Sequence, residues 1–218
     1  MLRAIGVSNV AVLGTIGTIR PTQCDFEHRA GLLFVAGMHQ PDSPNLDALR
    51  WYAEQILPAL EMLMGDHTPI LSVVGYRAPE LDLSEFAALP RIRMLGSIDD
   101  LQPVYNAHRL VIAPTRFAAG TPYKIYEAAG YGVPCIVTDL LARQLGWRDG
   151  VELAAVAVGD ASGFAARIAA AYRSAEQWSV LRDAALQRLA TENDAVGFYD
   201  TVRHVLNQVM QPDQERGE

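Results

Sequence analysis

One strand–loop–helix–strand unit in the middle of the chain constrains the fold more than any other stretch. The apolar run Leu110–Ala113 predicts a buried strand, and Cys135–Thr138 predicts the next one. Between them, Thr121 is expected to cap a helix whose first residue is Pro122, and Gly132–Pro134 is expected to end it. Strands joined through a helix form a βαβ crossover, so these two strands are predicted to be parallel.

The same alternation continues on both sides of this unit. Further buried strands are predicted at Gly31–Ala36, Ile70–Val74, Ile92–Leu95 and Val151–Val158, and amphipathic helices at 44–64, 101–107 and beyond residue 161. This pattern predicts a three-layer α/β sandwich with a doubly wound, mostly parallel sheet and C-terminal helices. A doubly wound lobe uses roughly 150 residues, so a chain of 218 residues has room for one. We expect a linker or entry strand at 1–29, the lobe at 30–210 and a disordered tail at 211–218.

Composition and charge argue against several classes of function. The net charge of −7, with no basic run, argues against a surface that binds nucleic acid. No apolar stretch approaches the ~20 residues that span a bilayer, and the first residues lack the layout of a signal peptide. Cys24 and Cys135 have no metal-ligand spacing, and no carboxylate cluster indicates a metal. The sequence therefore predicts a cytoplasmic protein with no metal and no cofactor.

The loop and helix start of the central unit favour an anion. A helix N-terminus here, at Thr121 and Pro122, presents free N–H groups and a partial positive charge, and Gly120 lets a ligand approach the backbone closely. Arg116 and Lys124 add two cations, which repel each other unless an anion lies between them. Glu127 lies one turn further on and can accept hydrogen bonds from hydroxyls. A phosphate beside a diol describes a nucleotide sugar. The alternative is an ordinary α/β turn with a Lys124–Glu127 surface pair.

Three segments carry a resemblance to a known family. The first consists of Gly31–Gly37 together with Pro44–Leu49, the second is Met94–Leu101, and the third is Gly120–Pro134. In order and spacing they resemble the C-terminal, donor-binding lobe of the group 1 glycosyltransferases, which have the two-lobed GT-B fold. The resemblance extends from Arg29 to about Trp147. It implies a Rossmann-like lobe that binds a UDP- or GDP-linked sugar for transfer to an acceptor, usually with retention of the anomeric configuration.

The resemblance also implies roles for particular residues. Glu127 would bind the ribose hydroxyls, basic residues would hold the diphosphate, and the backbone around Ile98 would contact the base. Gly37 and Gly75 end two predicted strands at the edge where doubly wound sheets bind ligands. The nucleotide sugar would be a substrate, and the resemblance implies no metal.

Two departures from the family pattern limit this interpretation. Many members carry an acid eight residues before the ribose-binding Glu, where this chain has Ala119, and many carry Arg and Lys in the loop that corresponds to residues 37–44. Arg116 and Lys124 would therefore hold the diphosphate. With a single lobe, activity is expected to require an acceptor lobe or a partner chain. The apolar face of the last predicted helix, around Phe198 and Tyr199, predicts self-association. A non-catalytic sugar-nucleotide or protein-binding module and a GT-B nucleotide-sugar epimerase are the alternatives.

Overall fold

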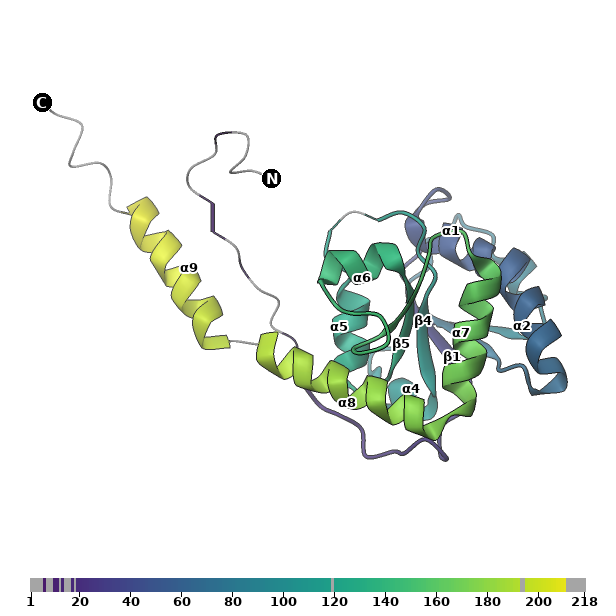
Figure 1. Cartoon of the computed structure of the whole chain (residues 1–218). Coiled ribbons are helices and arrows are strands. Elements are labelled where there is room, and N and C mark those ends of the chain that lie inside the picture. The colour runs from purple at the N-terminus through teal and green to yellow at the C-terminus, as the bar shows by residue number, and fades with distance from the viewer. Residues whose placement is uncertain are drawn as a thin grey trace, which may run out of the picture.

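The computed structural model of the chain describes residues 6, 10, 11, 13, 17, 19–118, 120–192 and 195–210. In this part of the chain, six parallel strands form one sheet in the order β3-β2-β1-β4-β5-β6 (Figure 1). The strands are β1 (Leu32–Val35), β2 (Leu71–Val74), β3 (Ile92–Gly96), β4 (Leu110–Ala113), β5 (Cys135–Thr138) and β6 (Ala154–Val156). The chain runs outward from β1 to β3, returns to place β4 beside β1, and then runs outward the other way. This order confirms the predicted doubly wound sheet.

Most of the sheet is buried on both faces, and the exception is the edge strand β3, in which only Ile92 is buried. Every residue of β2, β4 and β5 is buried, and three of the four residues of β1 are. Helices on both sides of a parallel sheet remove both faces from water, so its strands read as nearly continuous apolar runs. This is why their positions could be predicted from the sequence.

Two layers of helices enclose the sheet (Figure 1). One apolar cluster joins one face of the sheet to the first set of helices, and a second cluster joins the opposite face to the other set. The first set is α1 (Pro44–Trp51), α2 (Leu57–Met64), the short α3 (Ser84–Ala87) and α7 (Ala161–Arg173); the second is α4 (Gln102–Ala107), α5 (Tyr123–Gly130) and α6 (Asp139–Leu145). Helices α1 and α2 are joined by a π-helical turn at Tyr52–Ile56, so they form the one long helix that the sequence predicts.

Helix α8 (Ala175–Glu192) connects the two layers. Trp178 and Leu181 pack in the first apolar cluster, whereas Ala185 and Leu189 pack in the second. The last helix, α9 (Ala195–Met210), differs, because none of its described side chains is buried. The predicted tail at 211–218 lies outside the described residues.

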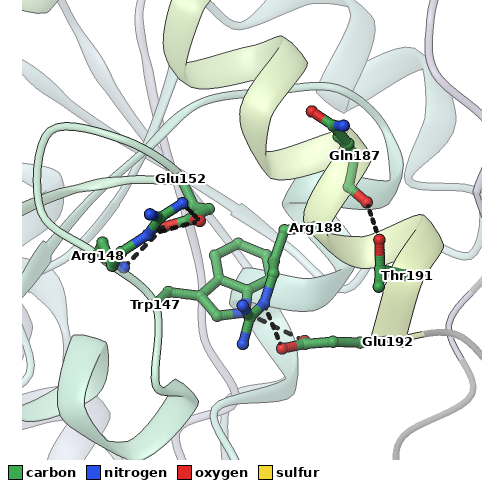
Figure 2. Close-up of polar contacts among 7 residues, drawn as sticks. All are labelled: Trp147, Arg148, Glu152, Gln187, Arg188, Thr191 and Glu192. Carbon is green, nitrogen blue, oxygen red and sulfur yellow. Dashed lines mark hydrogen bonds and ion pairs between the residues drawn. The ribbon is translucent and has the colours of Figure 1, made fainter.

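The end of α8 is hydrogen-bonded to the loop that follows α6 (Figure 2). The indole Nε1 of Trp147 donates a hydrogen bond to Glu192 Oε2 at 3.1 Å, and Arg188 pairs with the other carboxylate oxygen at 2.5 Å. Trp147 also packs edge-on against Tyr126, with ring centroids 5.6 Å apart, and is 4% exposed. It is therefore a packing residue.

The segment before β1 also packs on the lobe. The backbone N–H groups of Arg20 and Thr22 donate to the carbonyls of Gly130 and Tyr131 at the end of α5. The guanidinium of Arg29 is buried and donates to the carbonyls of Cys24, Tyr105 and His108 and to the hydroxyl of Thr22. Residues 19–29 are thus fixed against α4 and α5.

Candidate functional site

A pocket of about 300 Å³ opens where the strand order reverses, between the loops that follow β1 and β4. This is the position at which doubly wound sheets bind ligands. Its lining combines the start of α1 with the loop and first turn of α5: Pro44, Asn45, Thr115, Ala118, Gly120, Thr121, Pro122, Tyr123, Lys124 and Leu141. The structure thus brings together four of the predicted site residues, which are Gly120, Thr121, Pro122 and Lys124. We call this the switch-point pocket.

The predicted start of α5 is wrong by one residue. Thr121 does not cap the helix with its side chain, and Pro122 is not its first residue: Pro122 occupies the N-cap position with ψ of 72°, and the helix begins at Tyr123. The carbonyl of Thr121 accepts from Tyr123 N–H in a tight turn, which keeps Pro122 out of the helical conformation. Gly120 precedes this turn with φ of +88° and open space where a side chain would lie. The glycine leaves the helix N-terminus accessible from the pocket, which is the arrangement that favours an anion.

The ammonium of Lys124 is held at one wall of the pocket. Its Nζ donates to Asn45 Oδ1 at 2.6 Å and lies 4.9 Å from the ring centroid of Phe34. Asn45 is itself fixed, because its Nδ2 donates to the carbonyl of Gly37 at 2.8 Å. Burial disfavours the charged amine and lowers the pKa of Lys124 from 10.5 to about 8. The amide of Asn45 thus ties the end of β1 to the first turn of α5, and Gly37 supports the pocket through its carbonyl.

Arg116 does not line the switch-point pocket but lies next to it. Its guanidinium makes a bidentate contact with Asp47 on α1, with Nε 2.9 Å from Oδ2 and Nη2 2.5 Å from Oδ1. It also lies 5.7 Å from the centroid of the Trp51 ring. The carboxylate raises the pKa of Arg116 through its hydrogen bonds. Arg116 therefore already has an anionic partner within the chain, Asp47.

Glu127 does not line the switch-point pocket and contacts α4 instead. Its Oε2 accepts a hydrogen bond of 2.9 Å from the hydroxyl of Tyr105 on α4, and Ile98 packs in the same apolar cluster as Tyr105. Lys124 and Glu127 are thus not a surface pair: each side chain contacts a different neighbour, Asn45 on α1 or Tyr105 on α4. Ala119, where many family members carry an acid, lies outside the described residues.

Gly75 lies at a second pocket, of about 430 Å³, at the ends of β1, β2 and β3. A Cβ at this position would lie 2.2 Å from the carbonyl oxygen of Ala36, and φ is +147°. The close packing of two strand ends therefore requires a glycine here, independently of any role in ligand binding.

Sequence reasoning missed three residues that orient the predicted ones: Asn45, Asp47 and Tyr105. Asn45 and Asp47 lie in the first turn of the helix after β1, where the topology alone indicates proximity to the loop after β4. No sequence signal singles out Tyr105. Among the described residues, no group of three His, Cys, Asp or Glu side chains is placed to hold a metal ion. No described helix is both long enough and apolar enough to cross a membrane.

One comparison matches a protein family, and another matches the fold of solved structures. The model of the family described as glycosyl transferases group 1 matches residues 29–174. Among solved structures, S. aureus TarM, as a mutant in complex with Fondaparinux, alpha-GlcNAc-glycerol and UDP, superposes with a TM-score of 0.77 at 11% identity, over 94% of this chain and 41% of that one. The pneumococcal O-GlcNAc transferase GtfA in complex with UDP and GlcNAc superposes with a TM-score of 0.68 at 16% identity, over 91% of this chain and 39% of that one.

A third structure, Anabaena HepE in complex with UDP and glucose, gives a TM-score of 0.65 at 14% identity, over 84% of this chain and 49% of that one. The chain thus spans less than half the length of each of these proteins. No curated protein sequence matches the chain significantly.

Proposed function

Because this chain belongs to the group 1 glycosyl transferases, we propose that its switch-point pocket binds the diphosphate of a UDP- or GDP-linked sugar, and that the chain is the donor-binding half of a glycosyltransferase. The observation that carries the proposal is the ammonium of Lys124 at the open N-terminus of α5. An ammonium has three N–H donors. Asn45 accepts one of them, and no other acceptor is found among the described residues, so two donors are available to a ligand.

The chemistry of sugar transfer fits this arrangement. When the bond between sugar and diphosphate breaks, negative charge builds on the leaving phosphate. Lys124, the N–H groups at the start of α5 and the nearby Arg116 supply positive charge there, and fixed charges in a partly buried site stabilise such a transition state strongly. Glu127 would hold the ribose, and the backbone around Ile98 would hold the base. We propose transfer with retention, as family members usually show.

The proposal covers half of a two-lobed enzyme. Since the chain spans less than half of the related structures, the acceptor site and any group that activates the acceptor would belong to a second lobe, in the same protein or in a partner. We therefore expect the chain alone to bind nucleotides without transferring sugar. A non-catalytic sugar-nucleotide-binding module is the second candidate, favoured by Ala119 in place of the family's acid.

Calorimetric titration with UDP, GDP and their sugars tests the proposal. The chain should bind at least one of these nucleotides. Lys124→Ala and Glu127→Ala should each weaken binding by about tenfold or more, because the first removes a charged donor to the diphosphate and the second removes a charged acceptor of the ribose hydroxyls. Arg203→Ala is the charge control, since Arg203 is exposed on α9, where it pairs with Asp200. Absence of nucleotide binding, or an equal loss in all three variants, would overturn the proposal. Sugar transfer after addition of an acceptor lobe would favour the enzyme over the module.

A further inference from the structure

A buried phenol on α4 holds the carboxylate of Glu127. Tyr105 is fully buried, and its ring stacks on Tyr131 with centroids 4.6 Å apart and an interplanar angle of 16°. Its backbone is fixed as well, because the carbonyl accepts from Arg29 Nη1 at 2.8 Å. The hydroxyl of Tyr105 is therefore a rigid point beside a side chain that has three rotatable bonds.

The hydrogen bond between them has a defined direction. The phenol donates to Glu127 Oε2 at 2.9 Å. Burial, and then the negative charge of Glu127, raise the pKa of Tyr105, so the phenol keeps its proton and acts as a donor. The bond occupies one carboxylate oxygen and leaves Oε1 as an acceptor for a ligand.

We propose that Tyr105 is a positioning residue that holds Glu127 in the orientation that recognises the vicinal hydroxyls of the donor's ribose. The inference rests on the proposed function, because it assigns Tyr105 to the same nucleotide site. A Glu side chain without this bond samples several rotamers, and a ligand that binds it must first order it. Pre-orientation removes that ordering step from binding, which corresponds to about threefold to tenfold in affinity.

Tyr105→Phe tests this role, because it deletes one hydroxyl and keeps the stacked ring. The assay is calorimetric titration of UDP and of 2′,3′-dideoxy-UDP, which lacks the ribose hydroxyls. The wild type should prefer UDP, and Tyr105→Phe should reduce this preference by about threefold to tenfold while leaving the affinity for the dideoxy nucleotide unchanged. Glu127→Ala should abolish the preference, and adding Tyr105→Phe to it should change nothing further.

Tyr52→Phe is the matched control. Tyr52 is also fully buried, and its hydroxyl has no hydrogen-bond partner among the described residues, so this variant deletes a buried hydroxyl that does not touch Glu127. It should keep the full preference for UDP. Thermal melting of each variant checks that it is folded.

Three results would overturn the inference in distinguishable ways. If Tyr105→Phe weakened both nucleotides equally, or added to the effect of Glu127→Ala, Tyr105 would have a structural role only. If the folded wild type bound both nucleotides equally well, the ribose role of Glu127 would fail together with the inference. If it bound neither of these nucleotides nor GDP, the proposed function itself would fail; if it bound GDP instead, the same comparison would be made with GDP and 2′,3′-dideoxy-GDP.

Discussion

Nucleotide binding should weaken as the pH rises through 8, because Lys124 is then deprotonated. Burial lowers the pKa of this amine to about 8, so the folded protein loses the charge at a pH where an exposed lysine keeps it. About 90% of the amine is charged at pH 7 and about 10% at pH 9. If the neutral amine binds the diphosphate weakly, the dissociation constant for UDP should rise about tenfold over this range. The terminal phosphate of UDP titrates near pH 6 and keeps its charge throughout.

Two measurements check this expectation. Calorimetric titration of UDP at pH 7 and pH 9 gives the affinities, and Lys124→Arg supplies the control, since a guanidinium stays charged over the whole range. Lys124 is the only lysine in the sequence, so a sample labelled on its lysine side chain gives a single NMR signal whose titration reports the pKa directly. An affinity that stays constant between pH 7 and pH 9, or falls equally in Lys124→Arg, would show that the charge of Lys124 does not hold the diphosphate.

Three further predictions concern neighbouring parts of the lobe. Asp47→Asn removes the carboxylate that competes with a ligand for Arg116, so UDP should bind about threefold more tightly by calorimetry, and weaker binding would contradict this. The variant should lose less than ~1 kcal/mol of stability, because the Arg116–Asp47 pair is partly exposed. Gly75→Ala should lower the free energy of unfolding in urea by about 3 kcal/mol or more, because its Cβ would meet the carbonyl of the neighbouring strand. Gly146→Ala, at φ of +68° in open space, should cost only about 1–2 kcal/mol, and equal losses would refute the packing argument. The uncovered apolar face of α9 should cause self-association that Tyr199→Glu reduces, as measured by light scattering; a wild-type monomer at all concentrations would count against it.

The fold could be predicted because the inner strands of the sheet, β1, β2, β4 and β5, are buried on both faces. The observed limits of β4 and β5 are those predicted from the apolar runs Leu110–Ala113 and Cys135–Thr138. The single helical run from residue 44 to residue 64 also follows from its apolar stripe, although no sequence signal indicates the π-helical turn within it. Local pattern decides these elements, and the packing that follows is common to all doubly wound sheets.

The site could be predicted only where it depends on the backbone. The loop after β4, the glycine before α5 and the lysine in its first turn do line one pocket. The side-chain partners lie too far away in sequence to be predicted: Asn45 is 79 residues from Lys124, and Asp47 is 69 residues from Arg116. The sequence predicts the start of α5 one residue early, because proline at a first helical position and proline at an N-cap look alike in sequence.

A crystal structure of the chain with UDP would show where the diphosphate and the ribose bind. We expect a phosphate in the switch-point pocket, within about 3 Å of Lys124 Nζ and at the N-terminus of α5, with the ribose hydroxyls at Glu127. A nucleotide seated in the second pocket, beside Gly75, or one whose phosphates avoid Lys124, would contradict it.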